Sequence, residues 1–245
     1  MGIQLKKPNI IADNSGFCAG CGHGIINRIL AELLEEMGLE KKTIVTLAVG
    51  CSCIMGDYFM TDKILAPHGR APATATGIKR LRPDNVVITY QGDGDISSIG
   101  TAEIIHAAAR NEKLTGIFVN NGVYGMTGGQ MAPTTMPNQV TATSPHGRNT
   151  DSTGMPILLS EMLSVLPVSY IARGSVHNVA EIKKTKGYIK KALEKQLDNS
   201  GFSLVEILSP CPTNWHMAPC DAMKRIEEEI VPYYRLGELV NKEGK

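Results

Sequence analysis

Short apolar runs alternate with segments of helical periodicity along most of the chain, and this alternation constrains the fold more than any other feature. The run "KTIVTLAVG" at 42–50 is continuously apolar and β-branched, the pattern of a strand buried on both faces. The segment "HGIINRILAELLEEMG" repeats apolar residues at helical spacing and ends at Gly38, a position typical of the glycine that follows a helix. Strands that alternate with helices predict a doubly wound, mainly parallel α/β sheet.

The same patterns place the individual elements. The expected strands are 42–50, 85–91, 114–121, 168–173 and 201–210, the expected helices are 23–38, 73–82, 98–112, 155–167, 178–199 and 220–234, and the expected loops are 51–72 and 122–154. A loop as long as 122–154 inside a compact domain is either disordered or functional. Its glycines, together with Val123 and Met126, favour a functional loop.

Length and charge narrow the class of protein. The 245 residues, 42% of them hydrophobic, allow one large α/β domain or two small ones; we expect a single domain over 1–245 with its core at about 15–236. The net charge of +1, with acids and bases mixed, argues against a nucleic-acid partner. No apolar run approaches the roughly 20 residues of a membrane span. The N-terminus lacks an apolar signal region, so we expect an uncleaved, cytoplasmic protein that does not bind membranes.

The stretch "YQGDGDISSIG" at 90–100 lies where an expected strand is followed by a helix. In doubly wound sheets, ligands bind beyond the carboxyl ends of the strands, and glycine-rich turns before helices hold phosphate groups. Gly92 and Gly94 would let the backbone approach such a ligand. Asp93 would repel a bare phosphate, so we expect Mg²⁺ between the carboxylate and a diphosphate. Asp95 is expected only to cap the following helix.

A second oxygen ligand is expected at the end of the next strand, in "VNNGVYG". The arrangement of GDG followed about 25 residues later by NN resembles the thiamine diphosphate signature. By this resemblance, Asp93 and Asn121 supply side-chain oxygens to Mg²⁺ and Val123 supplies its backbone carbonyl. Asp-Gly and Asn-Gly pairs are also common turn formers, so either half of the pattern alone would indicate only a turn.

The six cysteines, at 18, 21, 51, 53, 211 and 220, indicate a second kind of site. Cysteines of a cytosolic chain bind metals or act in catalysis more often than they form disulfides. "VGCSC" follows the first expected strand and "SPCPTNW" the last, so these thiols could meet at the edge of the sheet that binds the diphosphate. Four thiolates suit Zn²⁺ or an iron–sulfur cluster, and the spacing leaves both open. Cys220 is expected to be an ordinary thiol.

Taken together, "CAGCGHG", "VGCSC", "HGRAPATATGIK", "GDGD", "VNNGVYGMTGGQMAPTT" and "SPCPTNW" resemble the β subunit of 2-oxoacid:ferredoxin oxidoreductases, closest to the 2-oxoisovalerate and 2-oxoglutarate members. The resemblance runs from Cys18 to Leu236 and implies a thiamine diphosphate-binding fold. It also implies a [4Fe–4S] cluster beside that cofactor, held by Cys18, Cys21, Cys51 and Cys211. Cys53 stands where the family commonly has a small residue, and Cys51 is preferred because it follows "VG" as the family's ligand does.

The resemblance gives roles to further residues around the cofactor. His23 is expected near the phosphates of thiamine diphosphate, with a packed or capping histidine as the alternative. His68 and Arg70 look like an anion-binding pair, unless they belong to a solvated loop. Thr127 and the glycines after it would reach the cofactor, and Met126 would contact the substrate, where an apolar residue suits a branched-chain 2-oxoacid slightly better than a charged one.

The implied activity is oxidative decarboxylation of a 2-oxoacid with coenzyme A to acyl-CoA and CO₂, with electrons passing through the cluster to ferredoxin. No acid here stands in a motif that would activate thiamine, so no catalytic residue is assigned to this chain. The activating glutamate is expected on a partner α subunit, in a complex with γ or δ subunits. Two alternatives remain: a non-redox thiamine diphosphate decarboxylase or carboligase subunit, and a zinc-stabilised scaffold subunit. The preferred 2-oxoacid is left open.

Overall fold

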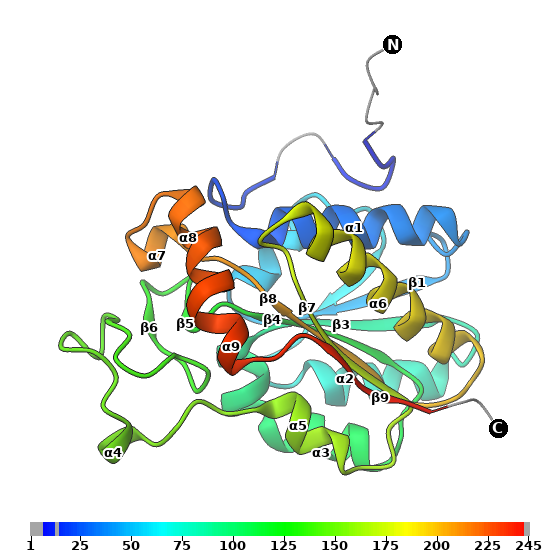
Figure 1. Cartoon of the computed structure of the whole chain (residues 1–245). Helices are drawn as coiled ribbons and strands as arrows, with labels where there is room; N and C mark the ends of the chain where they lie inside the picture. The colour runs from blue at the N-terminus through cyan, green and yellow to red at the C-terminus, as the bar shows by residue number, and fades with distance from the viewer. Residues whose placement is uncertain (1–6, 13–14, 243–245) are drawn as a thin grey trace.

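A computed structural model of the chain describes residues 7–12 and 15–242, and most of them form a layered α/β structure around one sheet (Figure 1). The strand order is β2 (Asp62–Leu65), β1 (Thr43–Leu47), β3 (Val86–Gly92), β4 (Thr115–Asn120), β8 (Ser203–Leu208), β7 (Tyr170–Ser175) and β9 (Gly237–Asn241). Neighbouring strands are parallel, except that β9 runs antiparallel to β7. The predicted doubly wound, mainly parallel sheet is confirmed.

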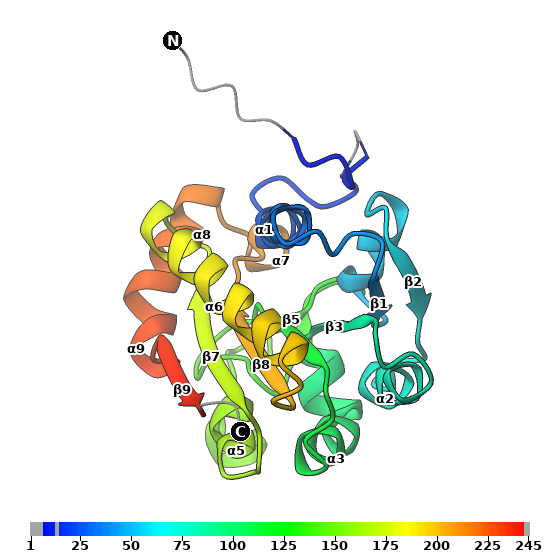
Figure 2. The ribbon, with the colours of Figure 1, turned by 90° about the vertical axis from the view of Figure 1, so that its right-hand side faces the viewer.

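Helices cover both faces of the sheet, which is clearest when the molecule is viewed end-on (Figure 2). One face carries α1 (Gly22–Glu36) and α6 (Val179–Leu197), and the other carries α2 (Ala71–Leu81), α3 (Thr101–Ala109) and α5 (Leu159–Ser164). Consecutive strand residues therefore enter opposite cores: Ile88 packs in the core that includes the buried face of α1, while Val87 packs with residues of α3. Burial on both faces is why the central strands read as continuous apolar runs.

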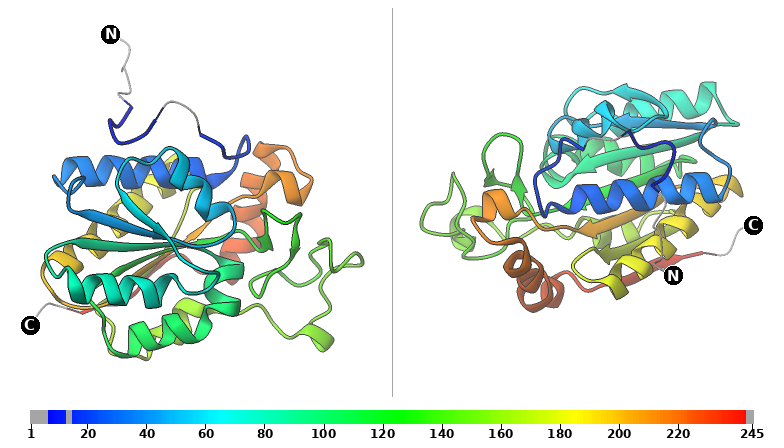
Figure 3. Two further views of the ribbon diagram at one scale, coloured as in Figure 1. Left: turned by 180° about the vertical axis from the view of Figure 1, so that it is seen from behind. Right: turned by 90° about the horizontal axis from the view of Figure 1, so that it is seen from above.

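The elements outside these layers gather at the carboxyl end of the sheet. They are the 3₁₀ helix η1 (Cys51–Asp57), the π-helical turn η2 (Asp95–Ile99), the hairpin β5 (Val123–Tyr124) and β6 (Gln130–Met131), and the helical segments α4 (Thr150–Thr153), α7 (Pro212–Trp215), α8 (Pro219–Arg225), η3 (Ile226–Ile230) and α9 (Val231–Tyr233). Seen from behind, the green segment 122–154 and the orange helices α7 and α8 lie at the same end of the sheet (Figure 3).

The connections at this end diverge between β1 and β3. The chain leaves β1 toward the edge strand β2, whereas it leaves β3 in the opposite direction toward β4. A crevice forms where successive connections diverge in this way, and ligands of doubly wound sheets bind there. Its walls are the segment after β1, which contains Cys51, and the turn after β3, which contains Asp93.

Several element predictions were wrong in detail. The expected loop 51–72 contains η1 and β2, and β9 lies after 234, where no element was expected. The helix expected at 220–234 is divided into α8, η3 and α9. No helix among the described residues is both long and apolar enough to cross a bilayer. The prediction about the N-terminal leader concerns mainly residues 1–6, which lie outside the described residues.

Candidate active site

A cavity lies at the carboxyl ends of β1, β3 and β4. Its walls come from 49–52, from 92–95, from His23 and His68, and from the segment that follows β4. Most residues predicted to contact the cofactor line it, namely His23, Gly92, Asp93, Gly94, Asn121, Val123, Met126 and Thr127, whereas Gly128 and Gly129 do not. The structure shows that these lining residues lie together in one cavity. Their binding of a cofactor stays a prediction.

Asp93 is the buried acid at the centre of this cavity, with 2% of its surface exposed. Its Oδ2 accepts hydrogen bonds from the backbone nitrogens of Asn121 (3.2 Å) and Gly122 (2.6 Å) and from Oγ1 of Thr134 (2.7 Å). Its Oδ1 accepts one bond, from the nitrogen of Gly94 at 2.8 Å, and so keeps capacity for another partner.

Burial raises the pKa of Asp93 to about 6, although these hydrogen bonds oppose the shift. Within the described part of the chain, no basic side chain forms an ion pair with Asp93. A buried carboxylate without a countercharge is costly, and a cation bound at Oδ1 would remove that cost. The site therefore fits the predicted Mg²⁺. The Asn121 side chain lies beside it, and its Oδ1 accepts one bond, from the nitrogen of Val123 at 3.1 Å.

The two glycines of the GDG turn have different roles. A Cβ on Gly94 would lie 2.3 Å from Cε1 of Tyr124, so the smallness of Gly94 is required by that ring. A Cβ on Gly92 would meet only Oγ of Ser52, at 3.9 Å, so Gly92 leaves space in the cavity. Both glycines were predicted to let a ligand approach the backbone. Gly92 does leave space for one, whereas the space beside Gly94 is filled by the Tyr124 ring.

The two cavity histidines are held differently. His23 is buried, stacks on Phe17 with ring centroids 4.9 Å apart, and contacts the Tyr90 hydroxyl through Nδ1 at 2.6 Å. His68 Nδ1 forms a short ion pair with Asp95, whose Oδ1 also accepts the nitrogen of Gly69 at 2.7 Å. Asp95 thus holds the 68–69 turn at the cavity, and the prediction that it only caps a helix was wrong.

Arg70 does not join His68 in an anion-binding pair. Its guanidinium pairs with Glu103 and donates to the carbonyl oxygen of Ile99 at 3.0 Å, and it does not line the cavity. The histidine and the arginine of "HGR" therefore contact different carboxylates, Asp95 and Glu103. The predicted pairing was wrong because adjacency in sequence does not decide which acid each side chain meets.

The four cysteines predicted to bind iron lie near enough to one another that three of them influence the fourth, Cys21, and Cys51 lines the cavity. Burial first, and then the neighbouring thiols of Cys211, Cys51 and Cys18, raise the pKa of Cys21 to about 12. Burial and the same kind of neighbours, including Cys53, raise the pKa of Cys51 to about 11. A metal centre that binds these thiols must displace their protons. Among the described residues, no three His, Cys, Asp or Glu side chains are grouped closely enough to hold a single metal ion.

Gly125 lines the cavity and lies close to two of the cysteines. A Cβ at this position would lie 3.1 Å from Sγ of Cys51 and 3.8 Å from Sγ of Cys211. Asn214 Nδ2 donates both to the carbonyl oxygen of Gly125 at 3.0 Å and to Sγ of Cys211 at 3.3 Å. Cys220 is exposed and is not among the thiols that influence Cys21 or Cys51, in keeping with an ordinary thiol.

Sequence reasoning missed three residues that shape the site: Thr134, which donates to Asp93; Asn214, which donates to Cys211; and Tyr90, which contacts His23. Each lies within or beside a quoted motif, but its role depends on a contact made by folding. The hydroxyl of Thr127, predicted to reach the cofactor, donates to Oε1 of Gln130 at 2.5 Å.

Comparison with known proteins gives the class of this fold and site. Residues 48–207 match the family described as Thiamine pyrophosphate enzyme, C-terminal TPP binding domain. The solved structure of 2-oxoglutarate:ferredoxin oxidoreductase from Magnetococcus marinus, with 2-oxoglutarate, coenzyme A and succinyl-CoA bound, matches with a TM-score of 0.80 at 27% identity. That match covers 99% of this chain and 87% of the other. The fold is that of the thiamine diphosphate-binding enzymes, as predicted.

Sequence relatives narrow the class further. The ketoisovalerate oxidoreductase subunit VorA of Methanothermobacter thermautotrophicus is 47% identical over 216 residues, covering 87% of this chain and 45% of that protein. The 2-oxoglutarate synthase subunit KorB of Archaeoglobus fulgidus is 37% identical over 217 residues, covering 87% of this chain and 76% of that protein. The chain belongs to the family of 2-oxoacid:ferredoxin oxidoreductase subunits. It spans about half the length of the VorA relatives.

Proposed function

We propose that this chain is the thiamine diphosphate-binding subunit of a 2-oxoacid:ferredoxin oxidoreductase. The overall reaction converts a 2-oxoacid and coenzyme A to acyl-CoA, CO₂ and a proton, and transfers two electrons to ferredoxin. The observation that carries the proposal is the cavity itself, lined by Asp93 and Asn121 on one side and by Cys51 on another. A non-redox thiamine enzyme does not need grouped thiols beside an unneutralised carboxylate, whereas an oxidoreductase uses both.

One set of residues would bind Mg²⁺ and the diphosphate, and a second set would bind the iron–sulfur cluster. Asp93, Asn121 and the carbonyl of Val123 would hold Mg²⁺, with His23, Gly92, Gly94 and Thr127 around the diphosphate. Cys18, Cys21, Cys51 and Cys211 would hold a [4Fe–4S] cluster, a ligand set that suits iron–sulfur centres. When bound, thiamine diphosphate supplies an electron sink for decarboxylation, and the cluster accepts electrons one at a time.

The proposal includes partner chains. Both carboxylates that line the cavity, Asp93 and Asp95, are already engaged in hydrogen bonds, which supports an activating glutamate supplied by an α subunit. Further γ or δ subunits and ferredoxin complete the electron route. A cytoplasmic location belongs to the same proposal, since free thiols stay reduced there.

We propose a branched-chain 2-oxoacid as the substrate, with 2-oxoglutarate as the second candidate. Met126, an apolar and adaptable side chain, lines the cavity and is 47% exposed. No Lys or Arg is among the described residues that line the cavity, so the second carboxylate of 2-oxoglutarate would need a cation from a partner. The relative with 47% identity is a ketoisovalerate oxidoreductase subunit, in keeping with this choice.

The test is anaerobic purification of the chain with the chains that accompany it, followed by analysis of iron, sulfide, zinc and thiamine diphosphate. Turnover is then measured on a panel of 2-oxoacids as coenzyme A-dependent reduction of a dye. We expect iron, sulfide and thiamine diphosphate in the complex and the fastest turnover with a branched-chain 2-oxoacid. Zinc without iron would support the scaffold alternative, and decarboxylation independent of both coenzyme A and the dye would support the non-redox one.

Two variants separate the two groups of ligands. Cys211→Ser should lose the cluster's visible absorption and dye reduction while thiamine diphosphate still binds. Asp93→Ala should weaken thiamine diphosphate binding at least roughly 100-fold, since a direct metal ligand matters no less than its supporting residues. Cys220→Ser, which removes an exposed thiol, is the control and should change neither property. Full turnover by Cys211→Ser or Asp93→Ala would overturn the assignment of that residue.

A further inference from the structure

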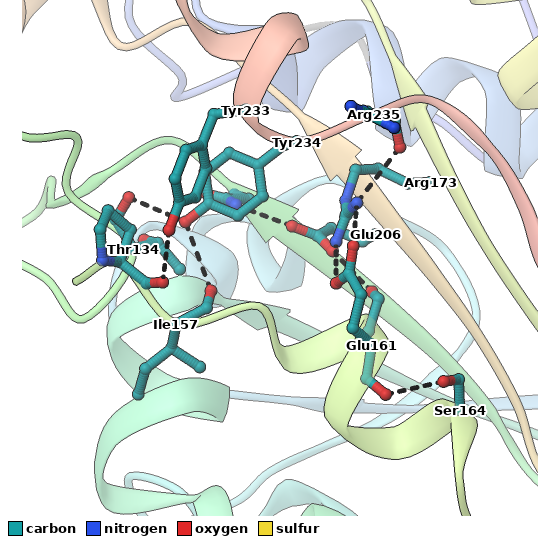
Figure 4. A network of polar contacts seen from close by, with 12 residues as sticks. Thr134, Ile157, Glu161, Ser164, Arg173, Glu206, Tyr233, Tyr234 and Arg235 are labelled. Carbon is teal, nitrogen blue, oxygen red and sulfur yellow. Dashed lines mark hydrogen bonds and ion pairs between the residues drawn. The ribbon is translucent and has the colours of Figure 1, made fainter.

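A buried arginine connects three elements behind the cavity (Figure 4). Arg173, on β7, is completely buried, and its Nε donates to Oε2 of Glu206 on β8 at 2.8 Å. Its two terminal nitrogens donate to the carboxylate of Glu161 on α5 at 2.8 and 2.6 Å. Glu206 is completely buried as well, and its Oε1 accepts Nδ2 of Asn120 at 2.8 Å. One end of this network therefore holds the residue before Asn121.

The other end of the network reaches Asp93 through Tyr234. The guanidinium carbon of Arg173 lies 5.2 Å from the centre of the Tyr234 ring. The Tyr234 hydroxyl donates to the carbonyl oxygens of Thr134 (3.1 Å) and Ile157 (3.3 Å), which share its single hydrogen (Figure 4). The side chain of the same Thr134 donates to Oδ2 of Asp93 at 2.7 Å. The two side chains predicted to bind Mg²⁺ are thus linked to one buried guanidinium, Asp93 through Thr134 and Tyr234, and Asn121 through the preceding residue and Glu206.

The chemistry of the network favours a positioning role. A buried ion pair often contributes no more to stability than well-packed apolar residues would, although removing one partner is costly. Its hydrogen bonds, however, require particular distances and directions. They therefore hold the residues at both ends of the network in place. With Thr134 held in place, three donors occupy Oδ2 of Asp93, and Oδ1 is the oxygen left with capacity for a cation. The position of Thr134 therefore decides which oxygen is presented.

We infer that Tyr234, Arg173 and Glu206 are positioning residues that hold Asp93 and Asn121 at the separation needed to bind Mg²⁺ and a diphosphate together. This inference rests on the proposed function for the identity of the ligand. Residues near the C-terminal end of the described chain thereby determine the affinity of a site built on β3 and β4.

Two adjacent tyrosines provide a matched test. Tyr234→Phe removes the hydroxyl that holds Thr134. Tyr233→Phe removes a hydroxyl that donates to the carbonyl oxygen of Pro156 at 3.0 Å. Thiamine diphosphate is titrated calorimetrically at saturating Mg²⁺ into the full chain with its accompanying chains, and Mg²⁺ is then titrated at fixed thiamine diphosphate. We expect Tyr234→Phe to raise both dissociation constants about tenfold, the lower range for residues that orient metal ligands, and Tyr233→Phe to leave them unchanged.

The unfolding temperature separates positioning from general destabilisation, because each variant loses one hydroxyl hydrogen, shared between two acceptors in Tyr234, and both should change the temperature by a similar small amount. Should Tyr234→Phe fail to fold, Thr134→Val, which removes the hydroxyl on Asp93, should weaken binding in the same way, and Thr134→Ser should restore it. Wild-type affinity in Tyr234→Phe, or in Thr134→Val, would overturn the inference and leave the proposed function intact. Failure of the wild-type protein to bind Mg²⁺ and thiamine diphosphate would overturn both.

Discussion

The hydrogen bonds around His23 determine which of its ring nitrogens carries a hydrogen. Asn27 Nδ2 donates to the carbonyl oxygen of His23 at 2.8 Å, which identifies that atom as the amide nitrogen, and to the Tyr90 hydroxyl at 2.9 Å. Tyr90 is completely buried, so its own hydrogen needs an acceptor, and His23 Nδ1 lies 2.6 Å away. Nδ1 is therefore unprotonated, and the neutral ring carries its hydrogen on Nε2.

A pH dependence of stability follows for the metal-free chain. Burial lowers the pKa of His23 to about 4 from 6.5. As the pH falls below 6.5, the unfolded chain takes up a proton that folded His23 refuses, so stability is lost until about pH 4, by roughly 3 kcal/mol in total. Urea unfolding at pH 7 and pH 5 tests this as the difference between the wild type and His23→Gln, which should lose less stability. The raised pKa of Asp93 adds stability to both proteins over the same range, so the loss in the wild type alone is smaller than the contribution of His23. His106→Gln replaces an exposed histidine and should show the pH dependence of the wild type. Equal pH dependence in all three proteins would contradict the explanation.

At the scale of elements, a single side chain organises the long segment after β4. Arg148 is buried, and its terminal nitrogens donate to the carbonyl oxygens of Pro133 (3.0 Å), Thr135 (2.5 Å), Thr153 (3.4 Å) and Met155 (3.2 Å). These acceptors belong to the two ends of one segment that has little regular structure. The oxygen of Pro133 also accepts the backbone nitrogen of Ile157 at 3.0 Å, whereas for the other three the planar guanidinium is the partner given, and it can serve several carbonyl groups at once.

Arg148→Lys should loosen this segment selectively, because an ammonium cannot reproduce the fork of donors. We expect a loss of roughly 2 kcal/mol in the free energy of unfolding, since hydrogen bonds made by a charged group are lost. Faster amide exchange should be confined to 122–154. Hydrogen exchange read by mass spectrometry checks this, with Arg82→Lys at an exposed position as the control. Uniform acceleration across the central strands would instead indicate general destabilisation.

The elements also show what the sequence could and could not reveal. The central strands were predictable because burial on both faces leaves a continuous apolar run, as at 114–121. The edge strand β2 was missed because all four of its side chains are exposed, so only its pairing with β1 makes it a strand. The helix predicted at 220–234 was located correctly but interrupted by the turn η3, which apolar periodicity alone does not reveal.

Some residues of the site could likewise be predicted from the sequence, and others could not. Asp93 and Asn121 were predictable because each follows directly on its own strand, and parallel strands bring their carboxyl ends together. Thr134 and Tyr234 could not be predicted as partners, since 100 residues separate them and only the folded chain brings the Tyr234 hydroxyl to the carbonyl oxygen of Thr134. The role of Arg70 was predicted wrongly because the choice between Asp95 and Glu103 is made by the folded helix α3 and the turn before it.

At the scale of the whole molecule, the site draws on both ends of the chain. Cys18 and Cys21 precede α1, whereas Cys211 follows β8, and Gly125 lies close to the thiols of Cys51 and Cys211. We infer that about 15–236 form one domain, because this region supplies every wall of the cavity and both cores share the same sheet. A ligand bound in such a cavity stabilises the entire fold, since unfolding any part of the sheet destroys the site.

Thermal unfolding with and without the cofactor tests this coupling. Thiamine diphosphate with Mg²⁺, at about 100 times its dissociation constant, should stabilise the chain by about 2.7 kcal/mol. For a domain of this size that raises the unfolding temperature by about 5–10 °C in one cooperative transition. EDTA should abolish the shift because the diphosphate reaches Asp93 only through the metal. Asp93→Asn should show no shift, yet its cofactor-free form should melt no lower than the wild type at pH 7, since burial penalises the charge that the variant lacks. Two separate transitions, or a shift that survives EDTA, would contradict a single domain closed around a metal-bridged diphosphate.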